Sequence, residues 1–177
     1  MNKKVLREKL KDLRSQISQE RRLAASETLL AHLLPQLFSY KHILSFVSFG
    51  HEIDMSLLNS RLAHEGRLLL PRIHGHNLQI FQITDIETQL FPNSFSLFEP
   101  GPAVCKEVSP SLIQCILIPA LGFDAQNHRI GYGKGFYDRF LKQIPHIQTI
   151  GIGFKEQYIT SIPVESTDIS LQKVSLF

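Results

Sequence analysis

The densest group of residues suited to binding a charged ligand is the segment 129–141, RIGYGKGFYDRFL. Three glycines alternate with larger residues in it: Gly131, Gly133 and Gly135. Glycines let backbone N–H groups approach a ligand closely, and the apolar pattern that follows predicts a helix whose positive dipole end faces the same place. Arg129 and Lys134 add two cations. The segment therefore predicts a phosphate-binding loop.

Asp138 stands in the first turn of that expected helix. Carboxylate oxygens are hard ligands suited to a magnesium ion that bridges nucleotide phosphates and protein, so ATP fits better than an uncharged ligand. The segment is neither a Walker A loop nor a Rossmann GxGxxG turn, because its glycines are spaced by two. The alternative is a glycine-rich turn in which Asp138 only caps a helix.

The N-terminal segment is strongly basic. Its cations are Lys3, Lys4, Arg7, Lys9, Lys11, Arg14, Arg21 and Arg22. Apolar residues recur there at steps of three and four, which predicts an amphipathic helix with a basic opposite face; they are Val5, Leu6, Leu10, Leu13 and Ile17. The net charge of +3 allows nucleic acid, membrane surfaces or phosphorylated small molecules as partners.

Strands and helices alternate along the rest of the chain, which predicts an α/β fold. Ser18 is placed to cap a second helix through Leu33 that stops before Pro35. A strand over 42–49 ends at Gly50, and a short helix capped by Asp54 or Ser56 runs through Glu65 to a left-handed Gly66. Further strands are expected over 67–70, 78–83, 114–119 and 149–153. Residues 84–113 are rich in proline and predict an ordered excursion or flap over the sheet edge.

Composition limits the class of protein. With 43% hydrophobic and 20% charged residues, the chain is neither disordered nor membrane-spanning, and we expect one domain over 1–177. The two cysteines, Cys105 and Cys115, form no CxxC pair, so we expect two inert thiols. The charged N-terminus lacks the apolar run of a secretion signal, and we therefore expect a cytoplasmic protein.

The segment 129–141, preceded by Ile118-Pro119-Ala120-Leu121-Gly122-Phe123-Asp124, resembles the signature of the 5-formyltetrahydrofolate cyclo-ligase family. Weaker matches follow in the expected order: Lys3-Lys4-Val5-Leu6-Arg7, Glu52-Ile53-Asp54, Leu70-Pro71-Arg72, Phe98-Glu99-Pro100 and 162–168. Two positions differ from the common bacterial pattern, with Lys134 in place of glycine and Phe136 in place of tyrosine. The resemblance implies a three-layer α/β/α fold with a mainly parallel central sheet and an N-terminal helical pair.

The resemblance also implies a role for particular residues. ATP would be bound by Lys3, Lys4, Arg7, Arg129, Gly131, Tyr132, Gly133, Lys134, Gly135, Phe136, Tyr137 and Asp138. Lys134, Arg129 and Tyr137 would be catalytic, and Asp138 and Asp168 would hold Mg2+. Folate would contact Phe49, Glu52, Phe95 and Tyr137. Lys3 and Arg7 lie four residues apart on one helical face, so both could reach one phosphate group.

The implied reaction converts 5-formyltetrahydrofolate (folinate) and ATP to 5,10-methenyltetrahydrofolate, ADP and phosphate. We expect a monomer with no nucleic-acid or membrane partner. One alternative is a folate- or nucleotide-binding protein without turnover, which would bind both ligands and form no product. The other is a nucleic-acid-binding module that uses the basic N-terminal helix, which would show steep salt dependence.

Overall fold

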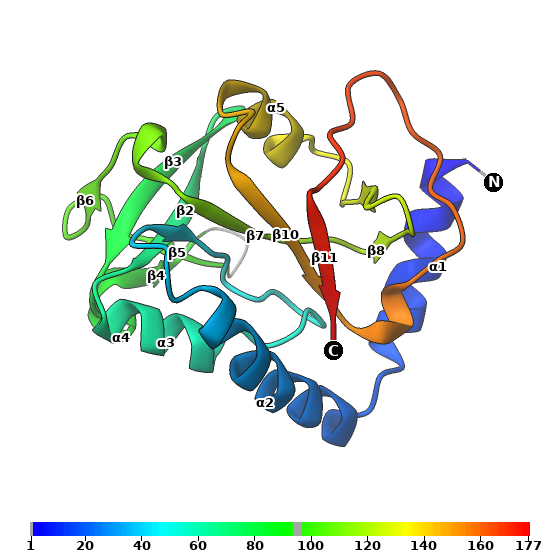
Figure 1. The fold of residues 1–177 in the computed structure, drawn as a ribbon, viewed down its shortest axis with the longest axis horizontal. Coiled ribbons are helices and arrows are strands. Elements are labelled where there is room, and N and C mark those ends of the chain that lie inside the picture. Colours follow the sequence, from blue (N-terminus) through cyan, green and yellow to red (C-terminus); the bar gives the residue numbers. More distant parts are fainter. Residues whose placement is uncertain (1, 94–96) are drawn as a thin grey trace.

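The computed structural model describes residues 2–93 and 97–177, and its centre is a seven-stranded sheet (Figure 1). The strand order is β11-β10-β7-β1-β2-β3-β6. The bounds are β1 Ile43–Leu44, β2 Leu68–His74, β3 Asn77–Ile83, β6 Lys106–Glu107, β7 Cys115–Pro119, β10 Gln148–Gly153 and β11 Lys173–Leu176. Pairing is parallel from β11 to β2, and β3 and β6 add antiparallel pairs. The predicted α/β class with a mainly parallel sheet is confirmed.

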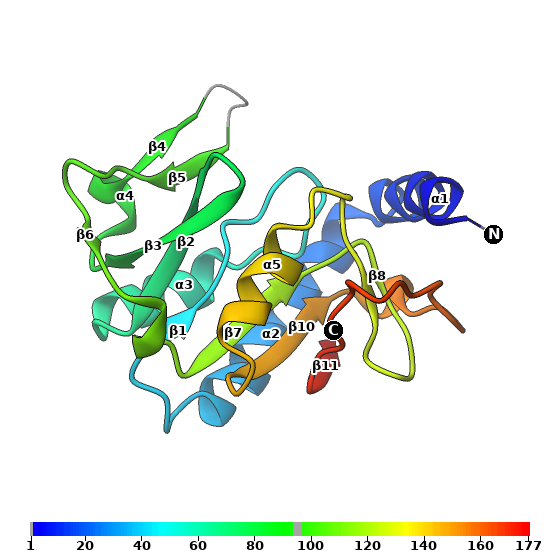
Figure 2. The ribbon, with the colours of Figure 1, turned by 90° about the horizontal axis from the view of Figure 1, so that it is seen from above.

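Helices cover both faces of this sheet because successive strand residues point to opposite sides. The helices are α2 (Gln19–Gln36) and α3 (Ser56–His64) on one face and α5 (Phe136–Gln143) on the other (Figure 2). In β1, Ile43 packs in the same apolar cluster as Leu33 of α2, whereas its neighbour Leu44 packs in the cluster of Phe140 of α5. These three layers are the predicted α/β/α arrangement.

The N-terminal helix α1 (Lys3–Ser15) packs apart from the sheet faces (Figure 2). Leu6 and Leu10 share a small apolar cluster with Leu121, Ile130 and Ile162. Leu121 lies a few residues before the segment 129–141, here called the glycine segment, and Ile130 lies within it, so this cluster fixes α1 beside that segment. The basic helix is therefore attached to the candidate site rather than to the core of the sheet.

The order in which the chain adds parallel strands to the sheet reverses between β1 and β7. From β1 the chain crosses through α3 to β2 on one side, and from β7 it crosses through α5 to β10 on the other. In open α/β sheets such a switch point leaves a crevice at the carboxyl ends of the two strands, where ligands bind. Glu52 follows β1, and the glycine segment follows β7.

Several predicted boundaries were wrong. The strand predicted over 42–49 pairs only at Ile43–Leu44, because the chain turns away after Ser45 into a loop in which the Ser48 hydroxyl bonds to the Ile53 carbonyl at 2.7 Å. The second helix continues through Pro35 to Gln36. Proline has no backbone N–H to bond to the carbonyl four residues earlier, and the helix ends one residue after it.

Three other details differ from the prediction. Helix α3 has Met55 at its N-cap, while the Asp54 side chain accepts a hydrogen bond from the backbone N–H of Ser56. Strand β11 was not predicted. On α1, Val5 is 54% exposed and Arg14 is 4% exposed, so a charged residue replaces an apolar one on the buried stripe.

The segment 84–113 contains short elements at the edge of the sheet. They are α4 Ile86–Gln89, β4 Leu90–Pro92, β5 Phe98–Pro100, β6 and the 3-10 turn η1 Pro110–Leu112. Strands β4 and β5 pair antiparallel, and β6 pairs with the edge strand β3. Among the described residues, no helix is long and apolar enough to cross a membrane.

Candidate functional site

The glycine segment runs from a strand of a small antiparallel ribbon, through the loop 131–135 (the glycine loop), into α5. The ribbon is β8 (Gly122–Phe123) with β9 (Arg129–Ile130). Gly135 is the left-handed N-cap of α5 at φ +68°, and Gly133 has φ +95°. Side chains rarely adopt such backbone angles, which explains glycine at these two positions. The backbone N–H groups of the loop therefore lie at the N-terminus of α5.

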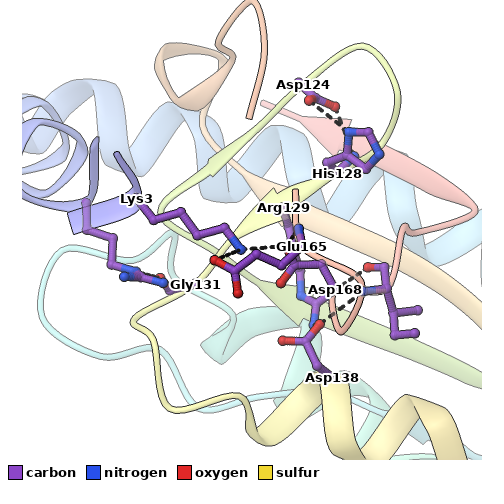
Figure 3. A network of polar contacts seen from close by, with 10 residues as sticks. Lys3, Asp124, His128, Arg129, Gly131, Asp138, Glu165 and Asp168 are labelled. Carbon is purple, nitrogen blue, oxygen red and sulfur yellow. Dashed lines mark hydrogen bonds and ion pairs between the residues drawn. The ribbon is translucent and has the colours of Figure 1, made fainter. Parts of the chain in front are cut away.

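Helix α1 supplies two cations beside this loop. Arg7 Nε donates to the Gly131 carbonyl at 2.9 Å, and a Cβ atom at Gly133 would lie 3.2 Å from Arg7 Cζ. Lys3 Nζ lies 2.5 Å from Asp168 Oδ2 and 3.2 Å from Glu165 Oε1 (Figure 3). Arg7 thus lies at the glycine loop, and Lys3 lies at the segment around Asp168.

Arg129 joins the loop, α5 and the C-terminal segment. Its Nη2 lies 2.7 Å from Asp138 Oδ1, and its Nη1 donates to the Ile169 carbonyl at 2.7 Å (Figure 3). The backbone N–H of Ile169 donates in turn to Asp138 Oδ1 at 3.2 Å. The Arg129 side chain is only 6% exposed, whereas that of Asp138 is 27% exposed, so water reaches the pair from the carboxylate side.

The two predicted magnesium ligands lie next to this network. Asp138 uses Oδ1 for both of its hydrogen bonds, and Asp168 uses Oδ2 for Lys3 and for the Glu165 N–H at 2.8 Å. Within residues 2–93 and 97–177 no group of three or more His, Cys, Asp or Glu could hold a metal. Nucleotide-bound Mg2+ needs only one or two carboxylates besides phosphates and water, and the second oxygens of these aspartates fit that requirement.

Glu52 forms the opposite side of the site. Its side chain is 7% exposed, accepts from the Phe49 N–H at 3.0 Å and from the Tyr132 hydroxyl at 3.1 Å, and lies 3.9 Å from Arg14 Nη1. Burial raises the pKa of Glu52, while the Phe49 amide, Arg14 and Tyr132 act to lower it. The Tyr132–Glu52 bond crosses the switch point between β1 and β7.

Two tyrosines of the glycine segment, Tyr132 and Tyr137, have raised pKa values. Burial, and then the nearby Glu52 charge, raise the pKa of Tyr132 to about 12. The same two causes raise the pKa of Tyr137, and the nearby positive charge of Arg129 only partly opposes them. Both hydroxyls therefore stay protonated at neutral pH.

Other predicted residues stand apart. Lys4 and Lys134 are exposed, and within the described residues the side chain of neither forms a hydrogen bond or ion pair. Phe136 packs under the guanidinium of Arg139 at 5.3 Å. Phe49 is 48% exposed, which leaves its ring available to a ligand, and Phe95 lies outside the described residues.

Sequence reasoning missed two residues of the site. Arg14 contacts Glu52 and Tyr132, and Glu165 contacts Lys3. A signal for Arg14 was present, because it follows Leu10 by four residues and precedes Ile17 by three on the apolar stripe of α1. Glu165 gave no local signal, since its partner lies near the opposite end of the chain.

The fold and this site define the class: an α/β protein with a candidate anion-binding loop at its switch point. The sequence profile of the 5-formyltetrahydrofolate cyclo-ligase family matches residues 1–176. The 5-formyltetrahydrofolate cyclo-ligase of Mus musculus is 30% identical over 186 aligned residues, which cover 97% of this chain and 92% of the mouse protein. That of Escherichia coli (strain K12) is 33% identical over 73% of this chain and 74% of the relative.

Solved structures agree with these sequence matches. The NMR structure of Aquifex aeolicus 5,10-methenyltetrahydrofolate synthetase superimposes with a TM-score of 0.87 and 27% identity, over 98% of this chain and 89% of that one. A 5,10-methenyltetrahydrofolate synthetase from Mycoplasma pneumoniae shares the fold with a TM-score of 0.78 at 22% identity, over 98% of both chains. The chain therefore belongs to the 5-formyltetrahydrofolate cyclo-ligase family, which confirms the family and enzyme class predicted from the glycine segment.

Proposed function

We propose that the protein catalyses the ATP- and Mg2+-dependent cyclisation of 5-formyltetrahydrofolate to 5,10-methenyltetrahydrofolate, with release of ADP and phosphate. Family membership supports the folate substrate. The observation that carries the proposal is the hydrogen bond between Glu52 and Tyr132, because it joins a buried carboxylate to a glycine loop flanked by Lys3 and Arg7. One site thereby offers a carboxylate for a pterin and a cradle for phosphates.

The reaction needs activation of an unreactive carbonyl. A formamide is a poor electrophile and hydroxide a poor leaving group. Transfer of the γ-phosphoryl group to the formyl oxygen releases ADP and creates a phosphate leaving group. The neighbouring side-chain nitrogen of the folate then attacks the formyl carbon, loses its proton to solvent, and expels phosphate together with the former formyl oxygen. Placement and charge neutralisation supply the catalysis, as in other phosphoryl transfers.

On the phosphate side, the glycine-loop N–H groups, Arg7 and Lys134 bind the triphosphate. Lys3 and Arg129 already pair with carboxylates, so the nucleotide phosphates compete with those carboxylates for the two cations. Asp138 and Asp168 would hold Mg2+, which neutralises phosphate charge when bound. Arg129, Lys134 and Tyr137 stabilise the charge that develops on the transferred group.

On the folate side, the ionised Glu52 accepts hydrogen bonds from the pterin edge. The exposed ring of Phe49 provides an apolar wall, and Phe95 is proposed as a second. Tyr137 lies between the two substrates, with its hydroxyl protonated. Both sides of the site come from one chain, which supports a monomer as the active unit, and we place the enzyme in the cytoplasm.

Absorbance of the conjugated methenyl product tests the proposal. Purified protein is mixed with 5-formyltetrahydrofolate, Mg2+ and ATP, and reactions without ATP or without Mg2+ serve as controls. We expect product only when all components are present, with one ADP formed per methenyl group. Tight binding of both ligands without product would contradict the proposed activity and favour a binding protein.

A further inference from the structure

Arg14 contacts the tyrosine that links the two sides of the site. Its Nη2 donates to the Tyr132 hydroxyl, and that hydroxyl donates to Glu52. We propose that Arg14 is a positioning residue which, through Tyr132, makes folate affinity depend on whether a nucleotide occupies the glycine loop. The proposal rests on the proposed function, because it assumes folate at Glu52 and nucleotide phosphate at the loop.

The surroundings of Arg14 are unusual for a structural arginine. The residue is 4% exposed, and its guanidinium lies 5.6 Å from the centre of the Tyr132 ring. Nη1 reaches the Ala120 carbonyl at 3.4 Å and Glu52 at 3.9 Å, both long distances. The buried Nε has no hydrogen-bond partner among the described residues. The charge is therefore buried but only partly satisfied.

Such an arrangement is a poor source of stability. A buried charge carries a desolvation penalty that only short, complete hydrogen bonding offsets. Arg22 offers a contrast, since it lies close by and bonds to two backbone carbonyls, those of Ile17 at 2.9 Å and Arg14 at 2.7 Å. The strongest contact of Arg14 is instead to the hydroxyl that contacts Glu52. This pattern favours a role in orienting the site.

Tyr132 connects this pair to the phosphate side. It stands between Gly131, whose carbonyl accepts from Arg7, and Gly133, which packs against the Arg7 guanidinium. A phosphate that draws Arg7 away or reorders the loop amides changes the backbone on both sides of Tyr132. Its hydroxyl, held between Arg14 and Glu52, transmits that change to the carboxylate that receives folate.

Because allosteric coupling is reciprocal, each ligand must then alter the affinity of the other by the same factor. In the wild type we expect a Mg2+-bound, non-hydrolysable ATP analogue to tighten folinate binding by about fivefold or more, the lower end of typical coupling. The same ratio must appear when the order of addition is reversed. This ratio is the quantity that the proposal predicts.

Isothermal titration calorimetry of folinate, with and without saturating analogue, measures the ratio. Tyr132→Phe removes the hydroxyl and keeps the ring, and Arg14→Lys keeps the charge and loses the guanidinium geometry. We expect both substitutions to bring the ratio close to one. A merely structural role would weaken folinate equally in both titrations and leave the ratio unchanged.

Matched controls are available elsewhere in the chain. Arg67→Lys alters another shielded arginine that bonds to carbonyls of Leu37 and Tyr40, and Tyr158→Phe removes a hydroxyl from a ring with 54% exposure. Both controls should keep the wild-type ratio. A wild-type ratio near one, or a full ratio in Tyr132→Phe, would overturn the coupling while leaving the proposed function intact. Failure of the wild type to bind either ligand would instead overturn the proposed function, and the coupling with it.

Discussion

The phosphate side and the folate side of the site satisfy their charges in different ways. On the phosphate side, each of two cations already has a carboxylate partner: Lys3 pairs with Asp168, and Arg129 pairs with Asp138. On the folate side, Glu52 accepts from an amide and a hydroxyl, and its nearest cation, Arg14, is 3.9 Å away.

This difference indicates how each half is prepared for its ligand. Carboxylates near Lys3 and Arg129 hold these side chains in place, so nucleotide phosphates exchange with partners already present. Glu52 is instead prepared by burial, which raises its pKa and leaves few groups to compensate for its charge. We therefore expect the phosphate side to tolerate loss of one cation, and the folate side to be sensitive to loss of one charge.

The largest effect is expected for Asp138→Asn. The amide oxygen can still accept from Ile169 and Arg129, so the fold is retained, but the charge needed for Mg2+ and for Arg129 is lost. We expect kcat to fall about 100-fold, as when a group that stabilises the transition state is removed. Turnover at saturating Mg2+ measures this, with the exposed Asp12→Asn as control. A near-normal rate would contradict the assignment.

A smaller effect is expected for Glu52→Gln. Loss of a charged hydrogen-bond acceptor should raise the folinate Kd about 30-fold and leave the ATP Kd nearly unchanged. Burial raises the pKa of Glu52, so the carboxylate takes up its proton at a pH above the ordinary glutamate pKa of about 4.3. As the pH is lowered, the affinity of the wild type for folinate should therefore begin to fall above that value. Titrations across pH should lack this decline in the variant. Glu27→Gln on α2 is the control. If Glu52→Gln changed only the Kd for ATP, the assignment of Glu52 to the folate side would be wrong.

Lys134→Ala should have a moderate effect. The side chain is exposed and free of described partners, so only its attraction to phosphate is lost. We expect the KM for ATP to rise about fivefold and the KM for folinate to change less than about twofold. Initial-rate kinetics measure both, with Lys142→Ala on α5 as control. A larger change in the KM for folinate would refute the phosphate role.

The smallest effect concerns the Lys3–Asp168 pair. Burial acts to raise the pKa of Asp168, but Lys3 and the Glu165 amide outweigh it and lower the pKa. The pair therefore contributes stability above the ordinary aspartate pKa, about 3.9, and this stability is lost as pH falls through the lowered value. Asp168→Asn should reduce the free energy of unfolding at pH 7 by about 1 kcal/mol.

Urea denaturation at pH 7 and pH 3 tests this pair. We expect the difference between variant and wild type to shrink at the lower pH. A difference that is the same at both values would show that the carboxylate charge does not stabilise the fold. The comparison is independent of catalysis, since it needs no ligand.

Local patterns predicted the elements that position the site. The stripe of α1, the buried strand β7 and the glycine loop before α5 each follow from spacing or residue type within a short window. The early end of β1 did not, because the loop after Ile43–Leu44 is also rich in apolar residues. Pairing of β11 with β10 likewise depends on partners that no local period reveals.

The site shows the same division. Gly133 and Gly135 were recognised as loop residues from their spacing alone. Lys3 and Arg7 were assigned to ATP through the family resemblance, and their helical spacing agrees with that role. The contact of Tyr132 with Glu52 joins residues 80 positions apart and could not be read from either segment. Arg14 was classed with the solvated basic face, because a charge on α1 is usually exposed, and only packing against Glu52 shows otherwise.

The most direct test of the central claim is a crossed binding experiment. Calorimetry would measure folinate and Mg2+-ATP analogue separately on the wild type, Glu52→Gln and Lys134→Ala. We expect Glu52→Gln to weaken only folinate and Lys134→Ala to weaken only the nucleotide. If both variants lost the same ligand, the assignment of the two sides of the crevice would be wrong.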